Sequence, residues 1–176
     1  INGEQQRGQA PLAEHFSLCY LTPRMDSLFV EGGASRRQYL DRLTTMLIPE
    51  HTKHLSIYDY AKYERMKLLK KGSADGQWLS VLERRMAEKA VAIAAARKEA
   101  IALLQSAINE DNSGFPTAIL GVSGQVENDL QELSAMKAED RFYEILLQTR
   151  AQDQQSGKTN NGVHKSDFVV YHEAKN

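Results

Sequence analysis

Apolar side chains recur with helical spacing over one long stretch of the sequence, residues 79–108. They are separated by three or four residues in an order that repeats every eleven residues, about 3.67 per turn, which is typical of a nearly straight α-helix. Asp75 is a suitable N-terminal cap, so we expect one helix from there to about Asn109, roughly 50 Å long at 1.5 Å per residue. The stripe consists of Leu79, Leu82, Met86, Ala90, Ile93, Arg97, Ile101, Leu104 and Ile108.

Two further helices are predicted before the long one. Ser35, with Gln38 three residues later, matches a capping box, and apolar residues follow it at helical spacing. Pro49 ends this helix and starts the next, which covers residues 50–71 and stops at Gly72. The stripe of the second helix consists of Leu55, Tyr58, Tyr63, Met66 and Leu69.

Short apolar runs predict strands at residues 16–22, 119–122 and 168–171. The outer two are expected to belong to a sheet whose other members are absent from the chain. Residues 126–146 carry one more long helix or two shorter ones, and a polar loop follows at 157–162. The pattern therefore predicts a mainly α (α+β) fold, in which long helices pack antiparallel as an arm with a few short flanking strands.

Composition sets limits on the partners and the compartment. The 22 Lys and Arg nearly balance the 23 Asp and Glu, so binding to nucleic acid or to an anionic membrane requires a local basic patch. Lone Cys19 excludes an intramolecular disulfide and indicates a buried thiol in a reducing compartment. No apolar run approaches the ~20 residues that cross a bilayer, so a cytoplasmic location without membrane contact is expected. The first residue is Ile1, and we interpret the chain as a piece of a longer protein.

Three motifs that suggest chemistry have simpler explanations. Ser156-Gly157-Lys158-Thr159 is similar to the end of a phosphate-binding loop, but the position of the required first glycine is Gln152. His51 and His54 have the i,i+3 spacing of a metal pair, yet no further ligand lies nearby, and solvent exposure is expected for both. The acidic run Glu127, Asp129 and Glu132 is interpreted as a solvated helix face. No catalytic, metal or cofactor residue is assigned.

Basic residues form a stronger candidate. Arg36, Arg37 and Arg42 lie at the start of the first helix. Residues 51–71 contain six Lys or Arg and two acids, with three tyrosines between them, a pattern that fits contact with a phosphate backbone. The alternative is the ordinary polar side of an amphipathic helix.

Four stretches in order along nearly the whole chain resemble the RecF family, the ABC-type ATPases of bacterial gap repair. They are Leu21-Thr22-Pro23 with Asp26 to Phe29, Arg36-Arg37-Gln38-Tyr39-Leu40-Asp41, Ala61 to Leu69, and Gly157-x-Thr159-x-x-Gly162-Val163-His164-Lys165-Ser166-Asp167. Val163, Lys165 and Ser166 depart from the Pro, Arg and Asp of the family pattern, and Lys67 stands near a preferred Asn. No catalytic role is therefore assigned to His164 or Lys165.

The resemblance implies a division of the chain into a strand segment of an ATPase lobe (1–30), a helical arm domain (31–156), and a loop with a returning strand (157–176). It implies a parent that binds ATP and Mg²⁺, dimerises, and acts in DNA replication and recombinational repair on single-stranded or gapped DNA with RecR-like and RecO-like mediators. Family members carry Walker A before this region and the signature and Walker B after it, so no ATP hydrolysis is expected of these residues alone.

Under this interpretation the arm contacts DNA, and the alternative is a protein-docking module without nucleic-acid contact. The candidate DNA-binding residues are Arg36, Arg37, Arg65, Lys67, Lys70 and Lys71.

Overall fold

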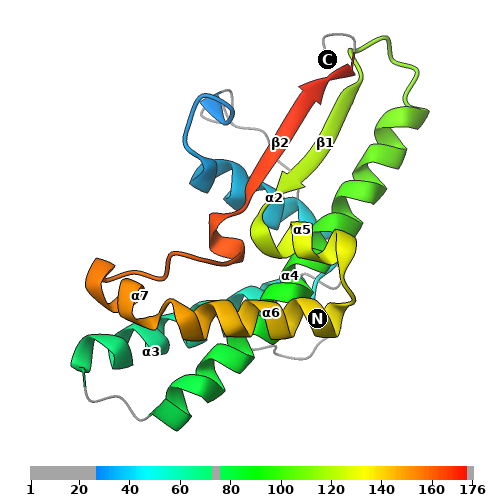
Figure 1. Cartoon of the computed structure of the whole chain (residues 1–176). Helices are drawn as coiled ribbons and strands as arrows, with labels where there is room; N and C mark the ends of the chain where they lie inside the picture. Colours follow the sequence, from blue (N-terminus) through cyan, green and yellow to red (C-terminus); the bar gives the residue numbers. More distant parts are fainter. Residues whose placement is uncertain (1–26, 73–75, 174–176) are drawn as a thin grey trace, which may run out of the picture.

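The longest helix, α4 (Gly76–Glu110), is the element against which most of the other helices pack (Figure 1). The computed structural model describes residues 27–72 and 76–173, so the expected cap Asp75, the expected strand 16–22 and Cys19 lie outside the described residues. The predicted long helix is confirmed. Its apolar stripe is buried as far as Arg97, and beyond this point Ile101 is only half-buried where α4 runs along the strands.

Two helices precede α4, as the sequence predicts. They are α2 (Gly33–Leu47) and α3 (His51–Lys71), and α3 ends at Gly72, which has a φ of 69°. The predicted capping box is wrong. The N-cap of α2 is Gly32, which has no side chain to accept a hydrogen bond, and Ser35 already lies in the first turn.

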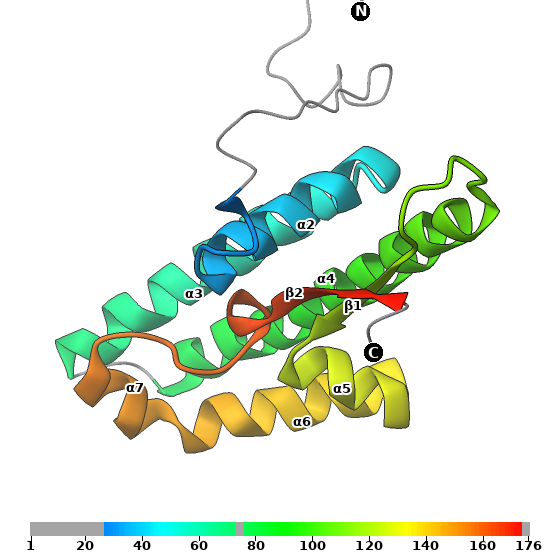
Figure 2. The same cartoon turned by 90° about the horizontal axis from the view of Figure 1, so that it is seen from above.

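Two strands pair antiparallel in the described part of the chain. They are β1 (Ala118–Ser123) and β2 (Asp167–His172), with Leu120 opposite Val170. The expected final strand therefore pairs with the middle one, which corrects the expectation that its partners are absent from the chain. Figure 2 shows the two strands seen edge-on, with α2 on one side of them and α5 on the other.

Two shorter helices cover residues 126–146, which confirms one of the two predicted alternatives, and a third helix follows before the loop. They are α5 (Gln125–Glu132), α6 (Ala135–Gln148) and α7 (Arg150–Ser156), and the 3-10 turn η2 (Val163–Lys165) precedes β2. Ser134 caps α6 through its side chain, which accepts from the backbone N–H of Lys137. Among the described residues, no helix has the length and apolar character needed to cross a membrane.

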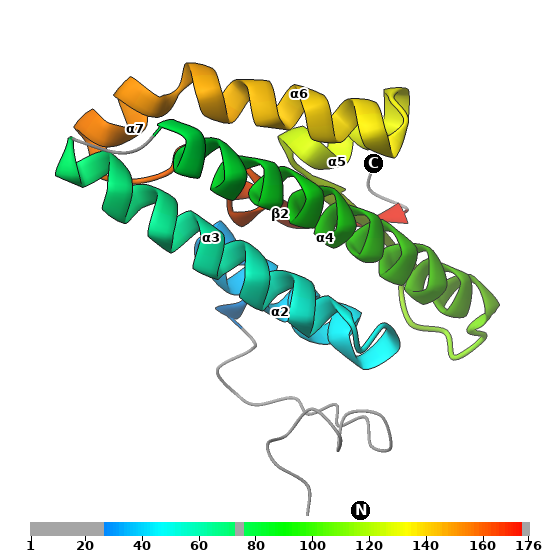
Figure 3. The same ribbon diagram turned by 90° about the horizontal axis from the view of Figure 1, so that it is seen from below.

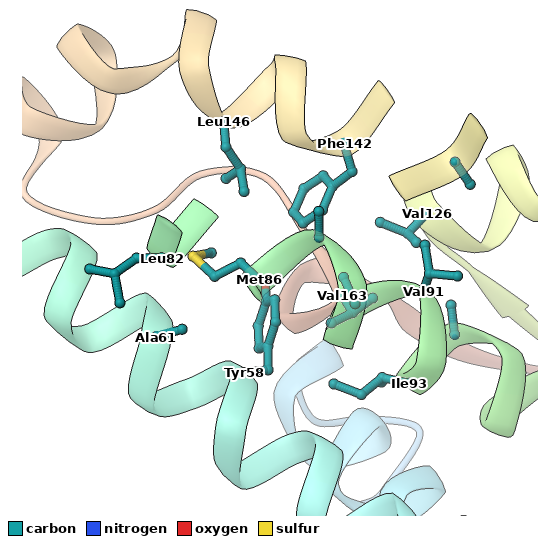
Figure 4. Packing of buried hydrophobic residues seen from close by; sticks show 14 residues of the cluster. Tyr58, Ala61, Leu82, Met86, Val91, Ile93, Val126, Phe142, Leu146 and Val163 are labelled. Atoms are coloured by element: carbon teal, nitrogen blue, oxygen red, sulfur yellow. The ribbon is translucent and has the colours of Figure 1, made fainter. Parts of the chain in front are cut away.

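The core lies where α3, α6 and η2 converge on the first half of α4. Figure 3 shows α3 and α6 on opposite sides of α4. Ala87, Ala90 and Ala94 are fully buried, and their small side chains allow this close approach. The larger side chains around them are Tyr58, Met86, Ile93, Phe142, Leu146 and Val163 (Figure 4).

Candidate nucleic-acid interface

The segment 157–167 is the last of the four stretches that resemble the RecF family. It runs back from α7 beside α3 to η2 and β2 (Figure 1). Gly157 ends α7 with a φ of 70°. Lys158 therefore follows the C-terminal end of a helix, where the helix dipole is negative, and not an N-terminus that attracts phosphate. This geometry agrees with the sequence-based rejection of a phosphate-binding loop.

The first half of this segment is held by a fully buried arginine, Arg65 of α3. Its Nε donates to Glu83 at 2.9 Å, and its Nη1 donates to Asp153 at 2.7 Å and to the Thr159 hydroxyl at 3.3 Å. Nη2 donates to the carbonyl of Leu146 at 2.8 Å. Arg65 has no exposed surface, so its assignment to a DNA-contacting surface is wrong.

The second half is held by Arg97 of α4, which has only 1% of its surface exposed. Nε and Nη2 donate to the two carboxylate oxygens of Asp41 at 2.8 and 3.0 Å. Nη1 donates to Glu127 at 3.0 Å and to the Val163 carbonyl at 2.9 Å. The Ser166 hydroxyl donates to the other oxygen of Glu127 at 2.7 Å. One guanidinium thus joins α2, α5 and η2.

This network corrects two expectations of solvent exposure. Glu127 and Asp129 are buried, where Glu127 accepts from Arg97 and Asp129 pairs with Arg141 at 3.1 Å, whereas Glu132 is exposed as predicted. His51 is also fully buried, and its Nε2 lies 2.8 Å from Asp41. Desolvation acts to raise the pKa of Asp41, but the hydrogen bonds from His51 and Arg97 outweigh it and lower that pKa.

The motif histidine, His164, is partly buried, and hydrogen bonds within the fold hold both of its ring nitrogens. Its Nδ1 lies 2.9 Å from the Tyr58 hydroxyl, and its Nε2 lies 2.9 Å from the Thr159 carbonyl. A carbonyl can only accept, so Nε2 carries the proton and Nδ1 accepts from Tyr58. Burial lowers the pKa of His164 to about 4, which keeps the ring neutral. Both ring nitrogens are used, so the imidazole has a positioning role.

We expect protonation of His164 to destabilise the fold as the pH falls. The unfolded chain binds this proton below pH ~6.5 and the folded chain only below about 4, so the free energy of unfolding should decrease by up to about 3 kcal/mol across that window and stay level for this group above it. His164→Gln keeps an acceptor for Tyr58 and a donor for Thr159. Urea unfolding of this variant should lack that part of the pH dependence.

His54 provides the control for this measurement. Burial also lowers its pKa, but its buried Nδ1 has no hydrogen-bond partner among the described residues. His54→Gln should retain the larger slope that comes from His164. Equal slopes for wild type and His164→Gln between pH ~4 and ~6.5 would contradict the assignment.

Arg36 and Arg37 of α2 are engaged with the end of the motif. Arg36 makes two hydrogen bonds to the Asp167 carboxylate, both at 2.8 Å. Arg37 donates to the Ser166 carbonyl at 2.7 Å and to the Gly33 carbonyl at 3.3 Å. The two stretches of family resemblance therefore contact each other, and these arginines hold α2 against η2 and β2.

One of the exposed lysines of α3 lies beside the loop that follows α7. Lys67, Lys70 and Lys71 are exposed. Lys67 has a long contact of 3.4 Å with Glu64, and none of the described carboxylates pairs with Lys70 or Lys71. A Cβ built on Gly157 would lie 3.8 Å from Cε of Lys70, which places this lysine at the edge of the loop.

Between α3 and the loop lies a concave surface, which we call the basic groove. Its volume is about 330 Å³. Lys158 and Lys165 are exposed there, with no described carboxylate as a partner, while Lys62 pairs with Asp59 at 2.6 Å. The groove is lined by Lys62, Tyr63, Met66, Gly157, Lys158, Thr159, His164 and Lys165.

None of the six candidate DNA-binding residues lines this groove. Its α3 wall consists of Lys62, Tyr63 and Met66, and Lys62 and Tyr63 belong to the basic, tyrosine-containing pattern of residues 51–71. The sequence pattern does not indicate Lys158 and Lys165 as part of a basic patch, because they lie about ninety positions after the lysines of α3, inside motifs that suggest phosphate binding or catalysis. Only the packing of the loop against α3 brings the two sets together.

The chain is similar in sequence to proteins called DNA replication and repair protein RecF. It is 38% identical to that of Mesorhizobium japonicum and 37% identical to that of Rhizobium meliloti, in each case over 99% of this chain and 47% of the relative. That of Rickettsia conorii is 37% identical over 94% of this chain and 46% of the relative. The chain thus spans about half the length of the curated relatives it matches. No family model matches it.

Solved structures agree on the fold. The recombination mediator protein RecF-ATPrS of the RecFOR pathway superposes with a TM-score of 0.82 over 97% of this chain and 47% of that chain, at 19% identity. The structure of RecF-ATP of the same pathway gives 0.73 over 86% of this chain and 42% of that chain, at 20% identity. At these identities the likeness concerns the fold alone.

Proposed function

We propose that the chain belongs to the RecF family, to whose curated members it is 37–38% identical over nearly its whole length, and that it supplies a DNA-contacting surface to a DNA replication and repair ATPase. The division into an arm (31–156) and ATPase-lobe segments (1–30 and 157–176) is part of this proposal. In the whole protein we expect ATP and Mg²⁺ binding, homodimerisation, and action at single-stranded or gapped DNA with RecO-like and RecR-like mediators. A cytoplasmic location follows from the same proposal.

The loop around Lys158 and Thr159 does not fit a triphosphate site. The hydroxyl of Thr159 is buried against Arg65, and Lys158 follows a helix C-terminus. The described residues also contain no group of three or more side chains suited to a metal ion. We therefore derive no step of ATP hydrolysis from these residues, and we assign the nucleotide to other parts of the whole protein.

The basic groove and its surroundings carry the proposal. Lys158 and Lys165 line the groove, Lys70 lies at its loop edge, and none of the described carboxylates pairs with any of the three. With a net charge of −1 for the whole chain, such a patch is the local excess that phosphate binding requires. Arg36, Arg37 and Arg65 are left out of the proposed surface because their guanidinium groups are engaged within the fold.

Charge reversal across the groove should weaken DNA binding. We expect Lys70→Glu with Lys158→Glu to lower the affinity for labelled gapped DNA at least tenfold at ~50 mM salt, because each substitution turns an attraction for phosphate into a repulsion. The slope of log K against log salt should fall by about 0.7–0.9 for each phosphate contact removed. Fluorescence anisotropy between ~50 and ~200 mM salt measures both quantities.

The matched control is Arg85→Glu with Lys137→Glu, which changes the net charge equally at exposed positions on α4 and α6. This variant should bind like wild type. Equal weakening in both variants would reduce the effect to net charge and contradict the groove. Absence of binding by wild type at low salt would contradict the DNA proposal.

A docking role rests on a different surface, near the start of α4. Trp78 and Val81 are each 51% exposed, and the guanidinium of Arg84 lies 3.9 Å from the ring centre of Tyr143. Aromatic residues and arginine are enriched at protein interfaces. If the chain does not bind DNA, this surface is where we would place contact with a protein partner.

A further inference from the structure

The basic groove contains an aromatic side chain that phosphate binding alone does not explain. Tyr63 is 65% exposed, and none of the described residues makes a ring contact or hydrogen bond with it. It lies on the lining together with Met66 and the ring of His164. An exposed aromatic ring in a concave apolar lining is a surface on which a flat ligand can stack.

The lysines stand around this lining. Lys62 lies one residue before Tyr63 on α3, and Lys158 and Lys165 are on the facing loop. The combination of an apolar lining and cationic edges matches a nucleotide, whose base is flat and apolar on its faces and whose phosphates are anionic. A plain polyanion site would not require the tyrosine.

The same geometry favours a single strand over a duplex as the ligand. In a duplex the bases are paired and stacked, so only phosphates would reach the lysines and the tyrosine would gain no contact. In a single strand a base can turn out and stack on an aromatic side chain. The volume of about 330 Å³ is at the lower end of the range for small-ligand sites, which suits one such unit.

We propose that the basic groove binds one unstacked nucleotide of single-stranded DNA, with its base on Tyr63 and its flanking phosphates on Lys158 and Lys165. This inference rests on the proposed DNA-binding function. It adds that the groove distinguishes single strands from duplex through stacking, while the lysines alone would bind both.

The test compares the 176-residue chain and its Tyr63→Ala variant by anisotropy with a labelled single strand and a duplex of equal length. We expect the variant to bind the single strand on the order of 5- to 100-fold more weakly and the duplex with unchanged affinity, because stacking on one aromatic side chain contributes this much per base. Tyr63→Phe keeps the ring and should bind like wild type. Tyr60→Ala, at a position 62% exposed that does not line the groove, is the matched control and should also bind like wild type.

A single strand with abasic residues separates the base from the phosphates. Wild type should bind it as weakly as Tyr63→Ala binds the normal strand, and Tyr63→Ala should cause no further weakening. Equal weakening on single strand and duplex, or no weakening on either, would overturn the inference. Displacement of the strand by a free mononucleotide at low concentration would also overturn it, in favour of a soluble nucleotide. If wild type binds no DNA at low salt, the proposed function itself fails, which is a distinct outcome.

Discussion

Replacing Arg97 by methionine is expected to lower the free energy of unfolding by about 3–5 kcal/mol, because removing one partner of a buried ion pair leaves the other charges uncompensated. Arg97 is 1% exposed and donates to Asp41 and Glu127, two carboxylates from different helices. In the wild type Arg97 also donates to the Val163 carbonyl. The variant loses this hydrogen bond between α4 and η2 as well. Methionine fills much of the volume, which keeps the packing defect small.

Urea unfolding followed by circular dichroism measures this destabilisation. The control is Arg84→Met, which removes an ion pair to Asp140 in which both side chains are more than half exposed and should cost less than about 1 kcal/mol. Arg97→Lys retains the charge without the bidentate geometry and should fall between the two. A cost for Arg97→Met similar to that of Arg84→Met would show that the buried carboxylates find other partners.

The helices could be predicted because their signals are local. The eleven-residue pattern lies within α4, and the glycine that ends α3 directly follows that helix in the sequence. The same pattern placed Arg97 on the buried stripe of α4, and the structure confirms that position. What the periodicity did not contain was the reason for an arginine there, since its partners are 56 and 30 residues away in the sequence.

Burial of Glu127 and Asp129 was not predicted for the same reason, namely that their partners are distant in the sequence. An acidic residue in a short helix is most often solvated, and nothing near Glu127 in the sequence indicates a cation. Its partners Arg97 and Ser166 lie on other elements. The α3 wall of the basic groove could be proposed from composition, whereas the loop wall needed tertiary contacts. Arg65 shows most clearly that composition does not predict which basic residues are exposed, because it lies in a basic helix and yet faces the interior.

Replacing Gly162 by alanine is expected to cost about 2–6 kcal/mol, the sum of backbone strain and overpacking. Gly162 has φ 128° and ψ 178°, a region that only glycine occupies readily. An added Cβ would overlap the Tyr58 hydroxyl and would lie 2.8 Å from Cζ of Phe142, so the core side chains must also move. The hydrogen bond between Tyr58 and His164 should break before other interactions do. This glycine is therefore explained by packing.

Gly114→Ala is the control for this substitution. Gly114 also has a positive φ, 79°, but nothing lies within 4 Å of an added Cβ, so its substitution should cost only about 1 kcal/mol of strain. The difference between the two variants in urea unfolding then contains the overlap with Tyr58 and Phe142 and the additional backbone strain at Gly162. A difference below about 0.5 kcal/mol would mean that the loop shifts freely, since overpacking a fixed core costs more than that. In that case the loop wall of the basic groove would be mobile, and Lys158 and Lys165 would not be held in place to receive the phosphates beside Tyr63.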